Sequence, residues 1–309
     1  MSQNRFFAAL TAAVFSLGLA AGESPTFTYT AIDHPNAKST SGSGINARGD
    51  IVGSYTDQAN VTRGFLLRDG NFATISFPGA VATQARGINS KGDIVGTHQG
   101  PNLLTPGSGG DIHGFLLPAG DSVPEPIDYP GHMNTITQRI TATGQILGCY
   151  HDHDQMGSMH GILVSNGTYV ALDGSEDGLN MPMSMSNGAT PDGSMITGLY
   201  TDMITGKSRS YIISGGNFAP FDVPGSLGTS AWDMNPSGEI VGAYRDAGSK
   251  VHGFLMTGGQ FFSIDYPAQG VRATQAFGIS PQGDVVGAYV DAAGVTHGFL
   301  LSQTRHHRD

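Results

Sequence analysis

Cysteine is almost absent from this sequence. The 309 residues include one cysteine, Cys149, so no disulfide can form within the chain and stability must come from packing. Charged residues are scarce at 13%, and 15 Lys and Arg face 25 Asp and Glu, for a net charge of −10. The only cluster of cations is in residues 303–309, which we expect to be a flexible tail. Since nucleic-acid backbones are bound by clustered cations, no nucleic-acid partner is expected.

Long hydrophobic runs are also missing, apart from one at the N-terminus. Arg5 precedes an apolar stretch from Phe6 to Leu19, and the small residues Ala-Ala-Gly follow at 20–22. This order is typical of a secretory signal peptide, and the apolar stretch is short for a membrane span. We therefore expect a signal peptide at 1–22 and a mature protein that is secreted or periplasmic, with no membrane span.

The common catalytic signatures are missing as well. The chain has no G-x-S-x-G elbow, P-loop, C-x-x-C or dinucleotide fingerprint. Trp232 is the only tryptophan, which argues against an aromatic sugar-binding site in every repeat. Neither absence excludes a single site that several repeats build together.

Glycine, in contrast, is abundant, and its 46 residues belong to a repeated pattern. The pattern reads GINARGDIVGSY, GINSKGDIVGTH, ITATGQILGCY, ATPDGSMITGLY, MNPSGEIVGAY and GISPQGDVVGAY, with turn glycines 43 to 52 residues apart. A segment of the HGFLL type and then one of the FxxIDYP type follow each copy, except that no such final segment follows the last. Each unit thus predicts four short strands, a to d, joined by tight turns.

Four-stranded units at this period predict an all-β fold, a six-bladed β-propeller of antiparallel blades. The segment 26–35 reads as a strand d without a preceding a, b or c, and 296–301 reads as a strand c without a following d. If the two pair, the last blade is closed by the N-terminal strand. We expect one domain over residues 23–302.

The repeat resembles the HAF-type repeat of secreted proteins, which combines a G-I-N-x-x-G-x-I/V-V-G segment with a following H-A/G-F. The resemblance covers nearly the whole mature chain and implies export and a propeller-like fold. It implies no activity and no catalytic residues. The fourth unit departs from it most, with Ser-Arg-Ser-Tyr at 208–211 in place of x-His-Gly-Phe.

Residues that recur in unit after unit are expected to be framework. The strand-c histidine is replaced by arginine in two units, so its shared role is predicted to be hydrogen-bond donation, to the Asp of the Tyr-x-Asp that ends strand b. The strand-d aspartates precede Pro-Gly turns and are predicted to cap backbone amides. These residues are His113, His160, His252, His297, Arg63 and Arg209 on strand c, and Asp33, Asp128, Asp173, Asp222 and Asp265 on strand d.

One stretch, YHDHDQMGSMH at 150–160, holds more metal-binding residue types than the repeat explains. His151 and His153 are the proposed imidazole ligands, projecting from a loop, with His160 or Met156 completing the set. Imidazole with thioether favours copper, and imidazole with carboxylate favours zinc or copper. His98 and His132 could join from neighbouring loops. A solvated polar turn is the alternative.

A second metal hypothesis concerns calcium. Asp173, Ser175 and Asp177 place oxygens at alternate positions before a glycine, as at the start of a calcium loop. Ser184 stands where the closing Glu of such a loop is expected. The alternative is an acidic surface insertion.

Two functions remain open. The first is an extracellular binding module, monomeric, whose loops hold a small molecule, a glycan or a protein partner. The second is a metal-assisted hydrolase or oxidoreductase with its site in the loops of units two to four. Fold analogy favours the first, but analogy cannot name a ligand.

Overall fold

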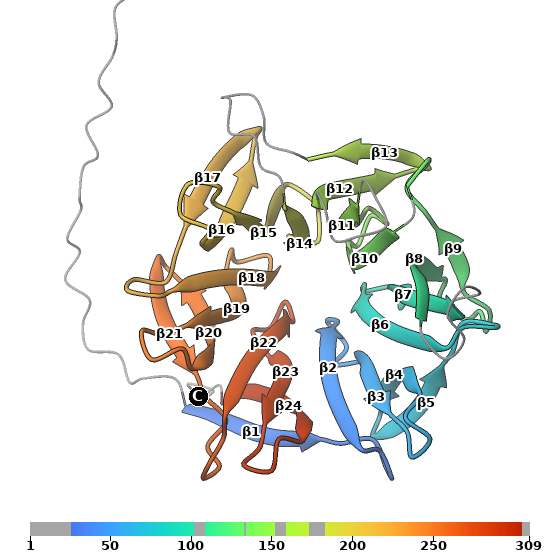
Figure 1. Ribbon diagram of the computed structural model, residues 1–309, viewed down its shortest axis with the longest axis horizontal. Coiled ribbons are helices and arrows are strands. Elements are labelled where there is room, and N and C mark those ends of the chain that lie inside the picture. The colour runs from blue at the N-terminus through green and yellow to red at the C-terminus, as the bar shows by residue number, and fades with distance from the viewer. Residues whose placement is uncertain (1–25, 102–108, 133, 152–158, 173–182, 305–309) are drawn as a thin grey trace, which may run out of the picture.

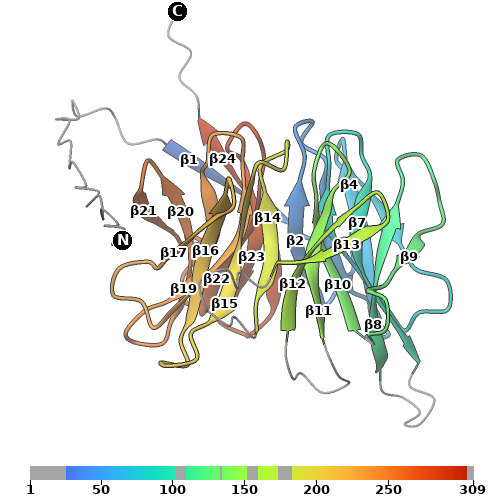
Figure 2. The ribbon, with the colours of Figure 1, turned by 90° about the horizontal axis from the view of Figure 1, so that it is seen from above.

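The computed structural model describes residues 26–101, 109–132, 134–151, 159–172 and 183–304. Their regular structure is entirely β, in 24 strands. None of the described residues forms a helix long and apolar enough to cross a membrane. The strands form four-stranded antiparallel units around a common centre, as Figure 1 shows, and Figure 2 shows the same units from the side.

Each unit runs from an innermost strand a to an outermost strand d. The first three units are β2 (Ser39–Ile45), β3 (Ile51–Thr56), β4 (Thr62–Arg68) and β5 (Asn71–Ile75); β6 (Ala82–Ile88), β7 (Ile94–Pro101), β8 (Gly109–Leu117) and β9 (Glu125–Ile127); and β10 (Asn134–Ile140), β11 (Ile146–His151), β12 (Met159–Ser165) and β13 (Thr168–Ala171). The next two are β14 (Met185–Ala189), β15 (Met195–Thr201), β16 (Ser208–Ser214) and β17 (Asn217–Phe221); and β18 (Gly228–Met234), β19 (Ile240–Arg245), β20 (Val251–Thr257) and β21 (Gln260–Ile264). The sixth combines β22 (Ala273–Ile279), β23 (Val285–Val290) and β24 (Thr296–Thr304) with β1 (Thr26–Ile32) from the other end of the chain.

The pairing of the two chain ends is as the sequence predicts. β1 lies antiparallel to β24 over seven residue pairs, from Thr26 opposite Thr304 to Ile32 opposite Gly298. Single parallel bridges, Thr62 to Ala82 and Val251 to Ala273, join the first unit to the second and the fifth to the sixth, so that each pair counts as one eight-stranded sheet.

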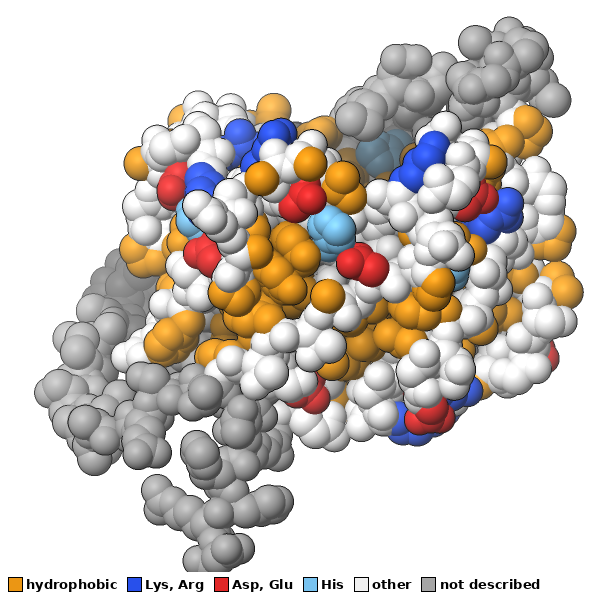
Figure 3. All heavy atoms as spheres, turned by 90° about the horizontal axis from the view of Figure 1, so that it is seen from below, with side chains coloured by type: hydrophobic (Ala, Val, Ile, Leu, Met, Phe, Trp, Pro, Cys, Tyr) orange, Lys and Arg blue, Asp and Glu red, His pale blue; other side chains and the backbone are white. Residues whose placement is uncertain are grey.

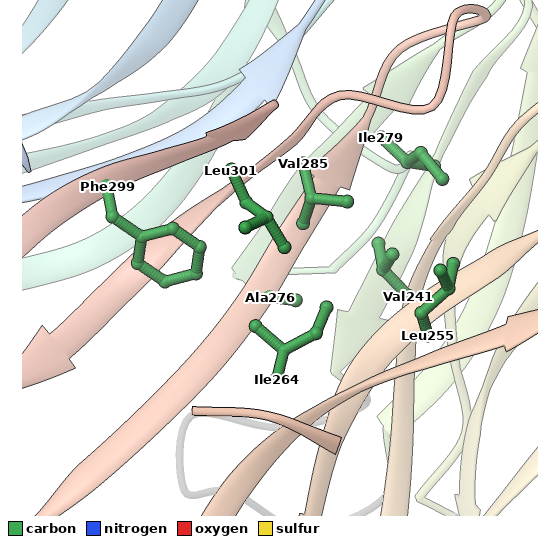
Figure 4. Packing of buried hydrophobic residues seen from close by; sticks show 8 residues of the cluster. All are labelled: Val241, Leu255, Ile264, Ala276, Ile279, Val285, Phe299 and Leu301. Carbon is green, nitrogen blue, oxygen red and sulfur yellow. The ribbon is translucent and has the colours of Figure 1, made fainter. Parts of the chain in front are cut away.

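The hydrophobic core lies between neighbouring units. In Figure 4, eight buried side chains come from the facing sheets of the fifth and sixth units. Phe299 is fully buried, and burying such a side chain stabilises the fold by about 1.5–3 kcal/mol. Its ring lies against Gly287, where a Cβ would sit within 2.8 Å of the ring. The G and the F of the repeat are therefore one packing pair.

Every innermost strand carries a β-bulge at the same place. The register with strand b shifts by one residue in all six units. Each shift leaves one residue of the innermost strand without a partner on strand b and changes the direction of its side chain. We call these six residues the axial ring: Ser43, Arg86, Gln138, Asn187, Trp232 and Phe277.

Candidate functional site

Two strand-c histidines, His252 and His297, each bind two aspartates that lie at the ends of the neighbouring strands. His252 Nδ1 lies 2.8 Å from Asp265 on the strand-d side, and its Nε2 lies 3.2 Å from Asp246 after strand b. In the sixth unit, His297 bridges Asp33 and Asp291 at 3.0 and 3.4 Å. We call these the rim contacts. Figure 3 shows histidine beside acidic side chains on the outer side of the molecule.

Arginine makes the same contacts where histidine is replaced. Arg63 Nε donates to Asp57 at 3.0 Å, and Arg209 Nε donates to Asp222 at 2.9 Å. The predicted donor role of the strand-c residue is thus confirmed in the units where these contacts are described. A donor that both side chains can supply is framework.

The prediction for the strand-d aspartates is wrong. Instead of capping backbone amides, Asp33, Asp128, Asp222 and Asp265 contact the strand-c side chains. The capping is done by the strand-b aspartates, because these stand at the tight b–c turn. Asp246, for example, accepts the amide of Lys250 at 2.9 Å, and this bond, followed by that from His252, lowers the pKa of Asp246.

Two of the predicted copper or zinc ligands, His151 and His160, lie within the described residues. His151 is the last residue of β11 and is 9% exposed, so the expectation that it projects from a loop is wrong. His160 lies opposite Tyr150, and His151 lies opposite Met159. Because successive strand residues point to opposite faces, His151 and His160 face different sides of the sheet.

The remaining predicted ligands of that site lie outside the described residues, namely His153 and Met156. His132 does come close, with its ring 4.3 Å from that of Tyr150, which in turn stacks on His160 at 4.9 Å. Within the described part of the chain, no group of three or more His, Cys, Asp or Glu could hold a metal ion. Copper or zinc binding stays a prediction.

The predicted calcium ligands, Asp173, Ser175 and Asp177, also lie outside the described residues. Ser184 is described, and it is fully buried. Its Oγ accepts the backbone amide of Gly161 at 3.0 Å, which ties the innermost strand of one unit to strand c of its neighbour. Ser184 therefore has a structural partner, and calcium binding by the loop before it stays a prediction.

His98 replaces the strand-b tyrosine in the second unit. Its ring stacks on Phe77 at 3.5 Å and lies 5.2 Å from the ring of His113. Burial, and then the nearby His113, lower the pKa of His98 to about 4. Its imidazole is therefore neutral near pH 7.

An ion pair occupies the centre of the molecule. The residue that follows the bulge is glycine in four units, but Arg139 in the third and Asp233 in the fifth. Arg139 Nε lies 3.2 Å from Asp233 Oδ1, and both side chains are almost completely buried. Burial lowers the pKa of Arg139 and raises that of Asp233, and each charge opposes the shift of the other.

The guanidinium of Arg139 also forms hydrogen bonds with backbone groups of several units. It donates to four carbonyl groups at 2.7 to 3.3 Å, those of Ser43, Arg86, Trp232 and Phe277. All four belong to axial-ring residues. The bulges of four units thus converge on one side chain.

The four glycines are explained by this crowding. A Cβ on Gly44 would lie 2.9 Å from Arg139 Nη1, and one on Gly188 would lie 2.5 Å from Asp233 Cα. Such distances are too short for real Cβ contacts. The absence of a Cβ at these glycines therefore leaves room for Arg139, Asp233 and the crowded backbone around them.

The ion pair borders a small apolar space on one side. A cavity of about 90 Å³ lies at the a–b turns, lined by residues that follow the bulges, among them Ile45, Ile88, Ile140, Met234 and Ile279. Along each innermost strand, the axial-ring residue stands one position before the ion-pair level, on the side away from the a–b turn. Partly exposed residues such as Gln84 and Gln275 lie further toward the start of these strands.

The axial ring itself is chemically mixed. Arg86 donates to the side-chain oxygens of Gln84 at 2.7 Å, Gln138 at 3.0 Å and Thr97 at 3.4 Å. Trp232 and Phe277 form an edge-to-face pair with centroids 5.6 Å apart.

Two polar atoms of the axial ring are buried and, among the described residues, have no hydrogen-bond partner. They are Asn187 Oδ1 and Trp232 Nε1. The amide nitrogen of Asn187 donates to the carbonyl of Ala231 at 2.7 Å. Since buried polar atoms are nearly always paired, these two atoms are exceptions that the hydrogen bonds of the described residues do not explain.

Sequence reasoning missed this site. Its signal was nevertheless present in the repeat, because unit three reads Gln-Arg-Ile-Thr and unit five reads Trp-Asp-Met-Asn where other units read x-Gly-Ile-Asn. An alignment of the repeats that scored departures as well as agreements would have exposed Arg139 and Asp233.

Comparisons with known proteins inform the fold. No family model matches the chain, and no curated protein matches it. Among solved structures, it is similar to a putative TolB from Agrobacterium tumefaciens, at a TM-score of 0.53 and 14% identity over 87% of this chain and 91% of that one. A protein of unknown function from Dyadobacter fermentans gives 0.57 and 12% over 89% and 98%.

A third solved structure is a mutant of Aleuria aurantia lectin in complex with Fucalpha1-6GlcNAc. It gives a TM-score of 0.50 and 11% identity, over 87% of this chain and 95% of that one. At such identities the similarity shows the fold alone. The chain has an all-β, propeller-like fold built of four-stranded sheets.

Proposed function

We propose that this protein is an exported, six-bladed β-propeller that binds a small ligand at its axial ring. The six units are its blades, and β1 completes the last of them. Export rests on the signal-peptide pattern at 1–22, and the relation to HAF-type repeats rests on the shared motif. The binding role rests on the axial ring.

One observation carries the proposal: six equivalent positions hold six different side chains. Where the repeat needs a structural part, it uses the same or a similar residue, as in the Gly-Phe packing pairs of four units, or an equivalent donor, as in the rim contacts. At the axial ring it uses Ser, Arg, Gln, Asn, Trp and Phe. Such a mixture of aromatic and polar side chains at equivalent positions is the composition expected of a ligand site.

Two further observations support the same place. The buried, unpaired atoms of Asn187 and Trp232 are suited to a ligand that supplies a donor and an acceptor. In addition, the lectin in complex with a fucosylated disaccharide shows that a protein of similar fold can bind a small sugar. Small sugars are therefore among the first ligands to test.

Trp232 provides the test, because it is the only tryptophan and belongs to the site. Intrinsic fluorescence would be followed during titration with a panel of monosaccharides, disaccharides, amino acids and short peptides. A ligand of the axial ring should change the emission. Calorimetry on Trp232→Phe should then show weaker binding, since the N–H donor and part of the stacking area are lost.

Phe262→Leu is the matched control, because Phe262 is an exposed aromatic residue on β21, outside the axial ring. Its affinity should equal that of the wild type. The proposal is overturned if no compound alters the emission, or if Trp232→Phe binds every ligand as tightly as the wild type does.

A further inference from the structure

We infer that the ligand of the axial ring is a small organic acid, with one carboxylate held by Arg86 and an apolar face packed on Trp232 and Phe277. This inference rests on the proposed function and names the class of its ligand.

The charge balance at the centre is the first argument. Two arginines, Arg86 and Arg139, lie there, and among the described residues one carboxylate, Asp233, accompanies them. Arg86 contacts three neutral oxygens instead of an acid. An unbalanced cation in a poorly hydrated place costs free energy, which an anionic ligand would recover.

Arg86 differs in this respect from the arginines at the periphery. Arg48 and Arg68 share Asp50 at 3.0 and 2.9 Å, and Arg63 binds Asp57. The molecule carries 25 acidic residues, so an acid partner for an arginine is easy to supply. Its absence from the described surroundings of Arg86 leaves the guanidinium available to a second molecule.

The guanidinium of Arg86 is also held in a fixed orientation. Gln84 accepts from Nη2, Gln138 from Nη1, and Thr97 from Nε. A guanidinium has five N–H donors, so one remains on each terminal nitrogen. Two such donors on a fixed plane suit the two oxygens of a carboxylate.

The apolar side of the site follows from the convergence on Arg139. The carbonyls of Arg86, Trp232 and Phe277 all bind its guanidinium, so their three side chains start from the same small region. The inferred ligand would extend from Arg86 to these two aromatic rings. The ring of a sugar acid and that of an aromatic acid can both pack there, and both carry the carboxylate.

The experiment compares acids with neutral partners of similar shape. Trp232 fluorescence and calorimetry would be recorded with galacturonate against galactose, and with benzoate against benzyl alcohol. At least one acid should bind about tenfold or more tightly than its neutral partner, as expected for a charge-assisted contact. The stronger acid identifies the source as sugar or aromatic.

Variants assign the preference to Arg86. Arg86→Gln should remove the advantage of the acid, whereas Arg86→Lys should keep part of it because the charge is retained. Lys250→Gln is the control, since it removes one exposed positive charge from the turn between β19 and β20, outside the axial ring, and should keep the full advantage. Circular dichroism would verify that each variant is folded.

The outcomes separate this inference from the proposed function. If neutral compounds bind at Trp232 as tightly as acids, the inference is overturned and the axial-ring site stands. An acid preference that persists in a folded Arg86→Gln variant also overturns it. If neither these four compounds nor any member of the panel of sugars, amino acids and peptides affects Trp232, both fail.

Discussion

The rim and the axis of this molecule use repetition in opposite ways. At the rim, a strand-c donor meets an aspartate in unit after unit, and an arginine that replaces the histidine meets its aspartate just as the histidine does. At the axis, six equivalent bulges present six different side chains. The rim contacts stabilise each unit separately, while the axial ring exists only when all units face one centre. In this repeat protein, positions with the same residue type in every copy therefore belong to the framework. Positions where the residue type differs mark the place where several copies build one site together.

The largest expected effect comes from breaking the joint between the two ends of the chain, where β1 pairs with β24. Deletion of residues 26–32 removes β1 and with it all seven pairs to β24, which leaves an open edge on the sixth unit. We expect aggregation or loss of cooperative unfolding, measured by size-exclusion chromatography and thermal circular dichroism. A monomer with an unchanged melting curve would show that β1 is dispensable.

At the axis, the next largest effect should follow from breaking the ion pair. Arg139→Met leaves Asp233 buried without its counterion and the four carbonyls without a donor, and should lower the free energy of unfolding by about 3–5 kcal/mol. Adding Asp233→Asn removes the isolated charge and should restore part of the loss. Urea denaturation measures the free energy of unfolding of the single variant and of the double variant. If the two variants were equally stable, Arg139 and Asp233 would not be a coupled pair.

A milder effect is expected from one rim contact. His252→Ala loses two contacts to aspartates and should lower the melting temperature by a few degrees. His252→Arg should lose less, because Arg209 makes this contact in the fourth unit. Neither should alter ligand affinity at the axial ring. If His252→Ala weakened binding as much as Trp232→Phe does, the division between rim and axis would be wrong.

The smallest effect concerns pH. The pKa of His98 is lowered from 6.5 to about 4, so the unfolded chain binds a proton more readily than the folded one between these values. The stability that neutral His98 contributes is complete above about pH 6.5 and is lost as the pH falls toward about 4. His98→Tyr, which restores the residue of the other units, should flatten this decline. Melting curves at about pH 5 and about pH 7 test it, and parallel shifts in both proteins would contradict the assignment.

The strands, the turn glycines and the pairing of the chain ends could all be predicted, because each depends on neighbouring residues or on a motif that recurs. The axis could not. The bulges are visible only in the pairing of two strands, and Arg139 meets Asp233 only after units three and five have been placed around the centre. His151 was misplaced for a related reason, since nothing local indicated that β11 continues through it.

The four carbonyls held by Arg139 also make the order of the units matter. In most repeat proteins, copies can be exchanged, because each touches only its neighbours. Here one side chain from the third unit donates hydrogen bonds to the backbone of the first, second, fifth and sixth units. A gene rearrangement that rotates the starting point around the ring keeps this arrangement, whereas one that exchanges the third unit with another destroys it. The chain has thus lost the modularity of the repeat from which it is built.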